Sequence, residues 1–456
     1  MELNIKSIAL TAVLAASSVI CAAQNTRSAY FTEGYLYRYQ MNPAIANERN
    51  FVAMPALGNM NVGINGNLSL DDVLYNVNGE TTTFLNPSVS ASEFLDGIND
   101  KNRLGADIKV GILAAGFKAF KGYNTIALNV RTNVQTQLPK SLFSLLKEGV
   151  ENTTYDISDV RAHADAYVEL ALGHSHKIND QWRVGATMKF LVGGANIDAE
   201  FDKAYLTLGE DSWNAVVEGQ LQSSIKGLTY ERDVNDRTGH EYVSGFDVDG
   251  TGINGFGMAF DLGAEFKLNR DWTFSASVLD FGFINWSNNV LASTNGVQEF
   301  STDKYSFNVD DDATNSFENE WDNMRDDLSA LYELNDMGDQ GSRTKMLGAT
   351  LNFAAQYNFP LYRNLSFGLL NTTRLQGEYT WTEFRLSANV NPVKAFSAGA
   401  NVAMGTYGCA FGWIMNVNTP GFNLFLGMDH TISKLAKQGV PLSSNASVNF
   451  GINFPF

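Results

Sequence analysis

Cysteine is scarce in this chain of 456 residues, which contains only Cys21 and Cys409. Cys21 lies in an N-terminal stretch that we expect to be removed, so the mature chain would keep one cysteine and no internal disulfide. Burial and hydrogen bonding must then stabilise the protein, even in an exported compartment that allows disulfides.

Long apolar runs and positive charges are scarce as well. After residue 23 no stretch reaches the roughly 18 consecutive apolar residues of a membrane-spanning helix, so any membrane crossing would use strands. The chain has 32 Lys and Arg residues against 49 Asp and Glu residues, which gives a net charge of −17. Nucleic acid and anionic lipid head groups are therefore disfavoured as main partners, because both would repel this chain.

The N-terminus has the three parts of a secretory signal peptide. A basic residue precedes a short apolar stretch from Ile8 to Ile20, and the small residues Ala22-Ala23 follow. Lipid attachment at Cys21 is the alternative, but Ser18-Val19-Ile20 lacks the leucine and small residues usual before a lipidated cysteine. We predict a signal peptide over residues 1–23 and export of the remainder.

Apolar and polar residues alternate with a period of two, which places one set of side chains on each face of a strand. In Phe256–Leu268, Phe and Leu residues occupy one face, and Gly257, Asp261 and Glu265 lie on the other. Leu347–Phe359 repeats the pattern. Both segments have the length of a tilted membrane-spanning strand with a lipid face and a wet face.

Further segments of this kind follow along the chain and are separated by turn-like clusters such as Asn179-Asp180. Together they predict an all-β fold: a transmembrane antiparallel β-barrel of about 14 strands, within a range of 12 to 16. The barrel would occupy residues 51–456. The predicted strands are Leu104–Phe117, Tyr123–Val134, Ala164–Lys177, Gln181–Val192, Asp271–Ile284, Leu365–Leu375, Tyr379–Asn391, Phe396–Met404, Phe411–Val417 and Phe422–Met428.

The last residues, from Val448 to Phe456, alternate up to an aromatic C-terminus. This resembles the terminal strand that outer-membrane barrels present to their assembly machinery, with Phe454 and Phe456 as the assembly signal. A soluble β-sandwich shows the same alternation in its edge strands. A barrel is favoured because nearly every predicted strand has a face rich in Phe and Leu.

Three stretches interrupt the strands. Ser90 and Glu93 form a capping box that predicts a short helix near Ser92–Ile98, and Pro139–Lys147 reads as a second short amphipathic helix. An acidic insertion over residues 301–343 contains a predicted helix from Glu318 to Leu334. So long an insertion is either a functional lid or external loop, or merely a solvated loop.

Several motifs near the N-terminus resemble an uncharacterised family of outer-membrane barrels in Bacteroidota, which carries a domain of unknown function. The tripeptide Asn42-Pro43-Ala44 is also similar to the hatch motif of FadL-type transporters of hydrophobic compounds and of type IX secretion-associated barrels. The motifs are Tyr30-Phe31, Tyr37-Arg38, Met41-Asn42-Pro43-Ala44, Phe51–Gly58 and Thr83–Pro87.

The resemblance implies a plug, formed by residues 24–50, that folds into the barrel lumen, and passage of a hydrophobic small molecule. Read from the residues alone, Pro43 fixes its own backbone and restricts Asn42, so this segment is a rigid turn whatever its role. A plain turn at the start of the first strand is the other reading. The acidic insertion departs from the FadL-type pattern and leaves the solute open.

The face opposite the apolar one carries charges of both signs. In a wide pore they would tune ion selectivity, and in a plugged barrel they would hold the plug by hydrogen bonds. The predicted lumen-facing residues are Glu169, Asp261, Glu265, Lys267 and Arg385.

Catalytic and metal sites find little support in the sequence. His174 and His176 share a strand face with apolar residues, and nothing in the sequence brings them or His430 to a nucleophile. Asp247-Val248-Asp249-Gly250 starts like a calcium loop but lacks the later glutamate, and the acidic run Asp310–Asp312 is typical of a solvated loop. We expect no enzyme, no cofactor and no metal.

We therefore predict a protein of the outer membrane, with membrane lipid and the barrel assembly machinery as partners and no nucleic acid. The leading hypothesis is a FadL-like channel for passive uptake of a hydrophobic or amphipathic small molecule. The alternative is a barrel without transport activity that binds a surface or secretion-system partner through its acidic loop. A lipid hydrolase dependent on His174 or His430 is the third hypothesis.

Overall fold

The structure is a computed structural model that describes residues 26–78, 80–149, 151–236, 238–250, 252–294, 296–306, 317–431 and 445–456. The predicted signal peptide and the run Asp310–Asp312 lie outside these residues. No helix in the described part of the chain is long and apolar enough to cross a membrane.

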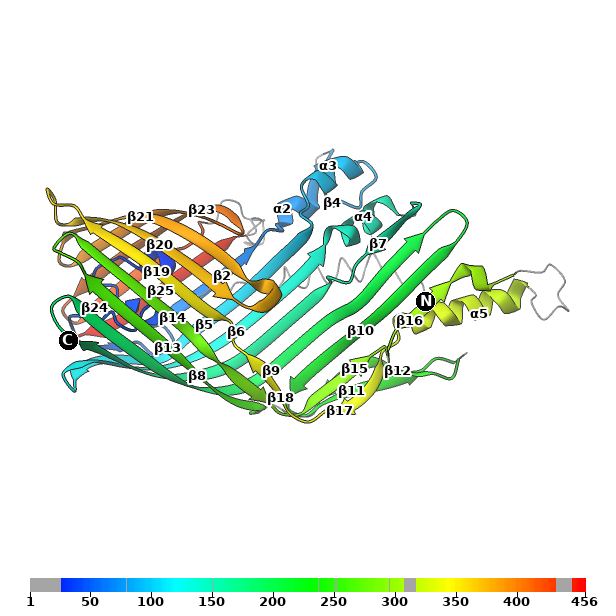
Figure 1. Cartoon of the computed structure of the whole chain (residues 1–456), viewed down its shortest axis with the longest axis horizontal. Helices are drawn as coiled ribbons and strands as arrows, with labels where there is room; N and C mark the ends of the chain where they lie inside the picture. The colour runs from blue at the N-terminus through cyan, green and yellow to red at the C-terminus, as the bar shows by residue number, and fades with distance from the viewer. Residues whose placement is uncertain are drawn as a thin grey trace.

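The chain forms a closed antiparallel barrel of 14 strands (Figure 1). The last strand closes the barrel by pairing with the first, which is split into two pieces. This confirms the predicted fold class. In barrel order the strands are β1 (Phe51–Ala53) with β2 (Met60–Gly66), β5 (Lys101–Ala119), β6 (Gly122–Pro139), β8 (Arg161–Lys177), β9 (Trp182–Leu208), β13 (Gly255–Lys267), β14 (Trp272–Trp286), β18 (Arg343–Met346) with β19 (Ala349–Asn358), β20 (Leu365–Leu375), β21 (Trp381–Val393), β22 (Phe396–Gly405), β23 (Gly408–Thr419), β24 (Phe422–Met428) and β25 (Ala446–Pro455).

The period-two alternation sorts the side chains between the outside and the inside of the barrel. On β13, Phe256 is 64% exposed and Leu262 59%, whereas Ala259 and Asp261 between them are buried. Burying the apolar outer side chains in lipid is favourable, and the closed sheet pairs every strand with a neighbour on each side.

The connections differ strongly between the two ends of the barrel. At one end, which we call the short-turn end, neighbouring strands are joined by tight turns such as Phe120-Lys121, where both residues have positive φ. That conformation matches the twist of a two-residue hairpin. At the other end, the long-loop end, the connections carry most of the remaining elements (Figure 1).

An extension continues one side of the barrel wall beyond the long-loop end (Figure 1). β9 runs for 27 residues, and its C-terminal half, from Ala195 to Leu208, pairs with β10 instead of β13. β10 in turn pairs with two strands that continue from β14. The extension comprises β10 (Trp213–Ile225), β11 (Leu228–Val234), β12 (Glu241–Val248), β15 (Asn289–Ser293), β16 (Gln298–Ser301), η3 (Thr302–Lys304), α5 (Phe317–Ala330) and β17 (Asn335–Asp339).

A small cap packs beside the extension on the same end. Its core contains the stacked rings of Phe84 and Phe94, 4.2 Å apart, with Phe143 against them. The Ser90 hydroxyl accepts a hydrogen bond from the Glu93 amide at 3.2 Å, as the capping box predicts. The cap comprises α2 (Leu70–Val73), β3 (Leu74–Val77), β4 (Glu80–Thr83), α3 (Ala91–Asp96), α4 (Lys140–Glu148) and β7 (Thr153–Asp156).

Candidate functional site

A segment from residue 26 to residue 50, which we call the hatch, lies inside the barrel at its short-turn half. It contains two single-turn helices, η1 (Arg27–Ala29) and η2 (Arg38–Gln40), and most of its side chains are buried. Tyr35 and Tyr37 pack edge-on against Phe425 of the wall, with ring centres 4.9 and 5.9 Å apart. The hatch therefore forms the packed core of this half of the lumen.

Hydrogen bonds fix the hatch to strands on opposite sides of the barrel. The carbonyl of Met41 accepts bonds from Ser277 and Asn352 at 2.7 and 3.0 Å. The Tyr37 hydroxyl donates to Asn453 at 2.6 Å, and the Ser175 hydroxyl donates to the Ala44 carbonyl at 2.6 Å. Because the partners are spread around the wall, the hatch crosses the lumen rather than lining one side.

The tripeptide Asn42-Pro43-Ala44 sits against the wall at two glycines. The Asn42 amide donates to the carbonyls of Ala264 and Ala276 at 3.2 and 3.3 Å, and its oxygen accepts from the Ala44 amide at 2.9 Å. A Cβ atom on Gly185 would lie 2.0 Å from the Pro43 carbonyl oxygen, and one on Gly263 would lie 2.1 Å from Asn42 Oδ1. These glycines leave the space that the tripeptide fills.

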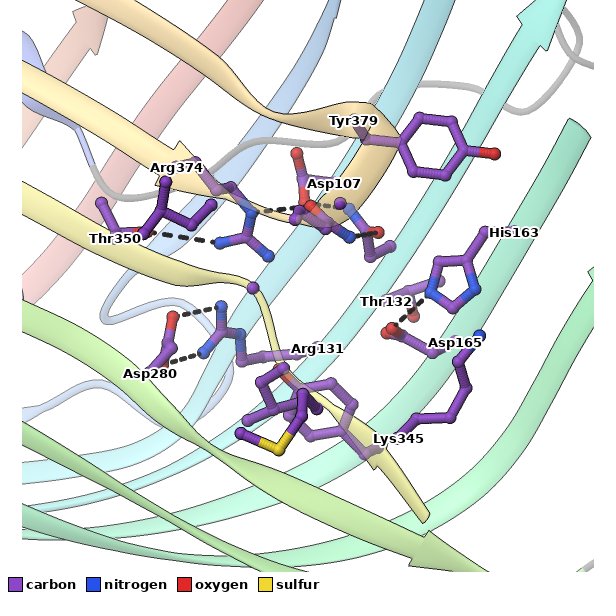
Figure 2. Close-up of a pocket in the computed structure, with 18 of the residues that line it drawn as sticks. Asp107, Arg131, Thr132, His163, Asp165, Asp280, Lys345, Thr350, Arg374 and Tyr379 are labelled. Atoms are coloured by element: carbon purple, nitrogen blue, oxygen red, sulfur yellow. Dashed lines mark hydrogen bonds and ion pairs between the residues drawn. The ribbon is translucent and has the colours of Figure 1, made fainter. Parts of the chain in front are cut away.

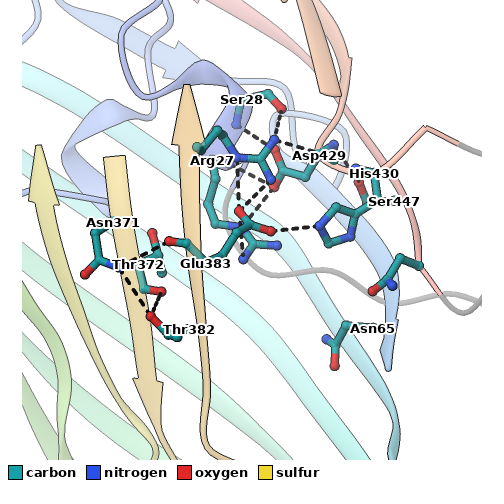
Figure 3. Close-up of polar contacts among 12 residues, drawn as sticks. Arg27, Ser28, Asn65, Asn371, Thr372, Thr382, Glu383, Asp429, His430 and Ser447 are labelled. Carbon is teal, nitrogen blue, oxygen red and sulfur yellow. Dashed lines mark hydrogen bonds and ion pairs between the residues drawn. The ribbon is translucent and has the colours of Figure 1, made fainter. Parts of the chain in front are cut away.

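The N-terminal end of the hatch is attached by a buried charged cluster (Figure 3). The backbone amides of Arg27 and Ser28 donate to the Asp429 carboxylate at 2.9 and 2.6 Å. The Arg27 guanidinium lies 3.6 Å from the Glu383 carboxylate and stacks over the Trp381 ring. His430 contacts the same Glu383 at 3.0 Å, so each charged group in the cluster has a partner.

A cavity of about 560 Å³ lies on the long-loop side of the hatch (Figure 2). Arg27 and Met41 of the hatch contribute to its lining, and the extended strands β8 and β9 form one wall. Part of the lining is apolar: Leu279, Ile284, Trp286, Met346 and Leu347. Charged side chains make up much of the rest, so the cavity combines both kinds of surface.

Arg374 is a buried cation of the cavity whose hydrogen bonds within the described part of the chain go only to neutral groups. It is 6% exposed, and its guanidinium donates to Gln376 at 2.8 Å and to Thr350 at 3.5 Å, both neutral groups. No ion pair joins it to an acidic side chain among the described residues. A buried cation that is in no close ion pair is costly, and its remaining donors can bind an anion.

A second cation of the cavity, Arg131, is fully paired. Its guanidinium donates two hydrogen bonds to Asp280 at 2.8 and 3.0 Å and lies 3.0 Å from Glu169. Asp280 has φ of +58° at a register shift of the wall, a conformation that is strained for a residue with a side chain. The Asp280 amide donates to Asp261 at 2.7 Å, which holds the strained residue in place.

A third group of charged residues faces the cavity from the wall that β8 and β9 form. His163 lies between two carboxylates, 2.7 Å from Asp198 and 3.0 Å from Asp165. Asp165 Oδ1 and Arg161 Nε are buried without a hydrogen-bond partner in the structure. Unpaired buried polar atoms are rare in folded proteins, and they suit a cavity that receives a polar ligand or water.

The predicted lumen-facing residues lie at different depths. Glu169, Asp261 and Arg385 are buried inside the barrel, where Lys189 lies 2.7 Å from Asp261 and Arg385 donates to Glu383 at 2.7 Å. Glu265 and Lys267 lie 3.9 Å apart towards the short-turn end, and Lys267 is exposed. None of the five lines the cavity.

Sequence reasoning missed Arg131 and Arg374, two of the residues that line the cavity. Each lies on the inward face of its strand beside an outward apolar residue, so the inward face could have indicated it. The sequence could not show which inward residues lie on the long-loop side of the hatch and which contact the hatch itself.

Of the histidines considered for catalysis, His174 and His176 are neighbours with ring centres 5.9 Å apart, whereas His430 lies inside the barrel. His174 and His176 occupy alternate positions on β8 that they share with the outward-facing Leu170 and Leu172. His430 is buried and contacts Glu383, while the nearby Ser447 hydroxyl accepts from the His430 backbone amide rather than from its ring. Within the described part of the chain, no group of three or more His, Cys, Asp or Glu side chains is arranged to hold a metal.

Residues 43–429 match a family described as "Family of unknown function (DUF5723)", as the resemblance to an uncharacterised family predicted. The Bacteroidota origin stays a prediction. No curated protein matches the chain.

Among solved structures, the chain is similar to the toluene transporter TbuX of Ralstonia pickettii, with 8% identity and a TM-score of 0.39, over 96% of this chain and 95% of that one. It is similar to the toluene transporter TodX of P. putida, with 9% identity and a TM-score of 0.37, over 96% and 95%. A FadL homologue of Pseudomonas aeruginosa has 10% identity and a TM-score of 0.39, over 96% and 99%.

Proposed function

The chain belongs to the family of unknown function DUF5723, and we propose that it is a hatch-gated channel of the outer membrane for an amphipathic small molecule with an anionic group. A closed barrel with an apolar outside is the β-structure that can cross a membrane, and exported chains of this kind reside in the bacterial outer membrane. Short turns then face the periplasm and long loops face the exterior.

The observation that carries the proposal is Arg374, a buried guanidinium that forms no ion pair among the described residues and lies in a cavity with an apolar wall. The apolar residues Leu279, Ile284 and Trp286 suit a hydrocarbon portion, and the guanidinium suits a carboxylate or phosphate. A purely hydrocarbon solute fits less well, because it would leave Arg374 and the charges around His163 unsolvated.

In this proposal the hatch is the gate that controls passage of the solute through the barrel. It separates the cavity from the short-turn end through bonds to several strands, so a bound solute reaches the periplasm only when the hatch moves. Hydrogen-bonded segments of this kind move without unfolding of the sheet around them. Uptake is passive in this proposal, since nothing in it requires an energy source.

Binding of an amphiphile to the full-length protein tests the proposal. A dodecanoate brominated at its chain end should quench the fluorescence of the cavity residue Trp286, and Trp286→Phe should remove that signal. Arg374→Gln should weaken binding by about 10- to 100-fold, the range of a lost hydrogen bond to a charged group.

The matched control is Arg363→Gln, which removes an exposed guanidinium from the turn between β19 and β20. It should leave the affinity unchanged. Equal binding by the Arg374→Gln variant, or equal affinity of the wild-type protein for dodecanol and dodecanoate, would contradict the proposal.

A second candidate function is binding of a surface partner by the extension. The observation in its favour is charge: about half of the 49 acidic residues of the chain lie in residues 194–254 and 287–343, with few basic ones. Charge of one sign steers a partner of the opposite sign. Co-purification of a stoichiometric partner that is lost on deletion of residues 301–343 would support it.

A further inference from the structure

A second recess, of about 850 Å³, lies at the short-turn end on the opposite side of the hatch from the cavity. Its floor is formed by hatch residues 46–48, and its walls are the ends of β5, β6, β8 and β9. We call it the vestibule. Ser175 lines it and also donates to the Ala44 carbonyl, so the vestibule begins directly beneath the Asn42-Pro43-Ala44 turn.

Four cations line the vestibule: Lys118, Lys121, Lys177 and Arg183. Lys177 is paired with Asp180 at 2.7 Å. For Lys118, Lys121 and Arg183, no ion pair with an acidic side chain exists among the described residues. The one acidic residue in the lining, Glu48, is exposed and forms no ion pair in that part of the chain either.

Two cations of other short turns lie beside a carboxylate. Arg363 forms an ion pair with Asp271 of the neighbouring turn, and Lys267 lies 3.9 Å from Glu265. Arg270 and Lys394 of other turns also form no ion pair among the described residues, but neither lines the vestibule. In a chain with a net charge of −17, the vestibule is distinguished by gathering three such cations around one recess. Like charges around one recess repel each other, and an anion placed among them relieves that repulsion.

From this arrangement we infer that the vestibule binds the anionic group of the solute, a carboxylate or a phosphate, as the solute leaves the hatch. This inference rests on the proposed function for the identity of the ligand. The recess focuses positive potential beneath the Asn42-Pro43-Ala44 turn, and such a potential raises the local concentration of anions. The cavity and the vestibule thereby form two anion sites separated by the hatch.

Calorimetric titration of the full-length protein in a neutral detergent tests the inference. The probes are dodecyl phosphate and inorganic phosphate, and all variants carry Arg374→Gln so that the cavity contributes little. The triple change Lys118→Gln, Lys121→Gln and Arg183→Gln should weaken binding of dodecyl phosphate at least tenfold. Binding should also weaken as salt is added, because the cations are solvent-accessible.

The matched control removes three cations from other short turns: Arg270→Gln, Arg363→Gln and Lys394→Gln. It should change the affinity less than twofold, and an equal loss in this control would overturn the inference. Equal affinity for inorganic and dodecyl phosphate would also overturn it, since the site would then take free anions rather than the head group of the solute. The proposed function fails separately, in the dodecanoate experiment at Arg374.

Discussion

The two halves of the lumen are built from the same fourteen strands but differ in what fills the space inside them. In the short-turn half, amides and hydroxyls such as Asn352 and Ser277 bond the hatch backbone, and aromatic rings fill the space between. In the long-loop half the space is an open cavity, lined by the Arg374 guanidinium, which forms no ion pair among the described residues, and by the charged group around His163.

This difference can be interpreted through the proposed function. A close-packed interior is rigid, whereas an open cavity with charged walls can receive a ligand or water. In that proposal the hatch half is the closed gate and the cavity half is the binding site.

The largest expected effect comes from breaking the charged attachment of the hatch. Asp429→Ala removes the acceptor of two backbone amides and a partner of Arg27, and loss of one member of a buried pair costs about 3–5 kcal/mol. Amide exchange of residues 26–32 should become much faster. Asp180→Ala, which breaks an exposed pair on a turn, should leave that exchange unchanged; slow exchange in both variants would refute the attachment.

Filling the space of a wall glycine should displace the hatch without removing any bond. A Cβ on Gly185 meets the Pro43 carbonyl, and overpacking of this kind costs about 1–3 kcal/mol. Gly194→Ala on the same strand is the control, because its Cβ would lie 3.4 Å from its nearest neighbour. Gly185→Ala should lower the midpoint of denaturant unfolding or open the pore in bilayers, and Gly194→Ala should do neither.

A substitution in the cavity half should raise the stability of the protein, whereas those in the hatch half lower it. Arg374→Met replaces a buried unpaired cation by an apolar side chain of similar length, so the protein should gain about 1 kcal/mol of stability while it loses anion binding. Denaturant unfolding and dodecanoate titration of the same variant measure both quantities. A loss of stability would show that Arg374 is a structural residue.

The smallest effect is expected outside the lumen. Ser90→Ala removes the N-cap of α3 in the exposed cap and should cost about 0.5 kcal/mol. Thermal unfolding detects the change, and bilayer conductance should stay that of the wild-type protein. Altered conductance would mean that the cap contributes to the gate.

The barrel could be predicted because its lipid face and its wet face alternate residue by residue, as on β13 and β20. The predicted bounds of β20 and β24 agree with the structure. The helices near residues 92–98, 139–147 and 318–334 could also be located, since capping and periodicity are local signals.

The extension and the cavity could not be predicted in the same way. β9 was expected to end at Val192, but it continues past Gly193-Gly194, where Trp286 packs against the space left by Gly193. That contact joins residues far apart in the chain. The pairing of Arg131 with Asp280, and the lack of any such partner for Arg374, likewise depend on which strands face each other across the lumen.

Single-channel conductance in planar bilayers tests the central claim most directly, by comparing the intact mature chain with one that lacks residues 24–50. If the hatch closes the lumen, the intact chain should be silent or open only briefly, and the shortened chain should form a stable open pore. A shortened chain that is folded and inserted but as silent as the intact one would contradict the account, because the lumen would then be closed without the hatch.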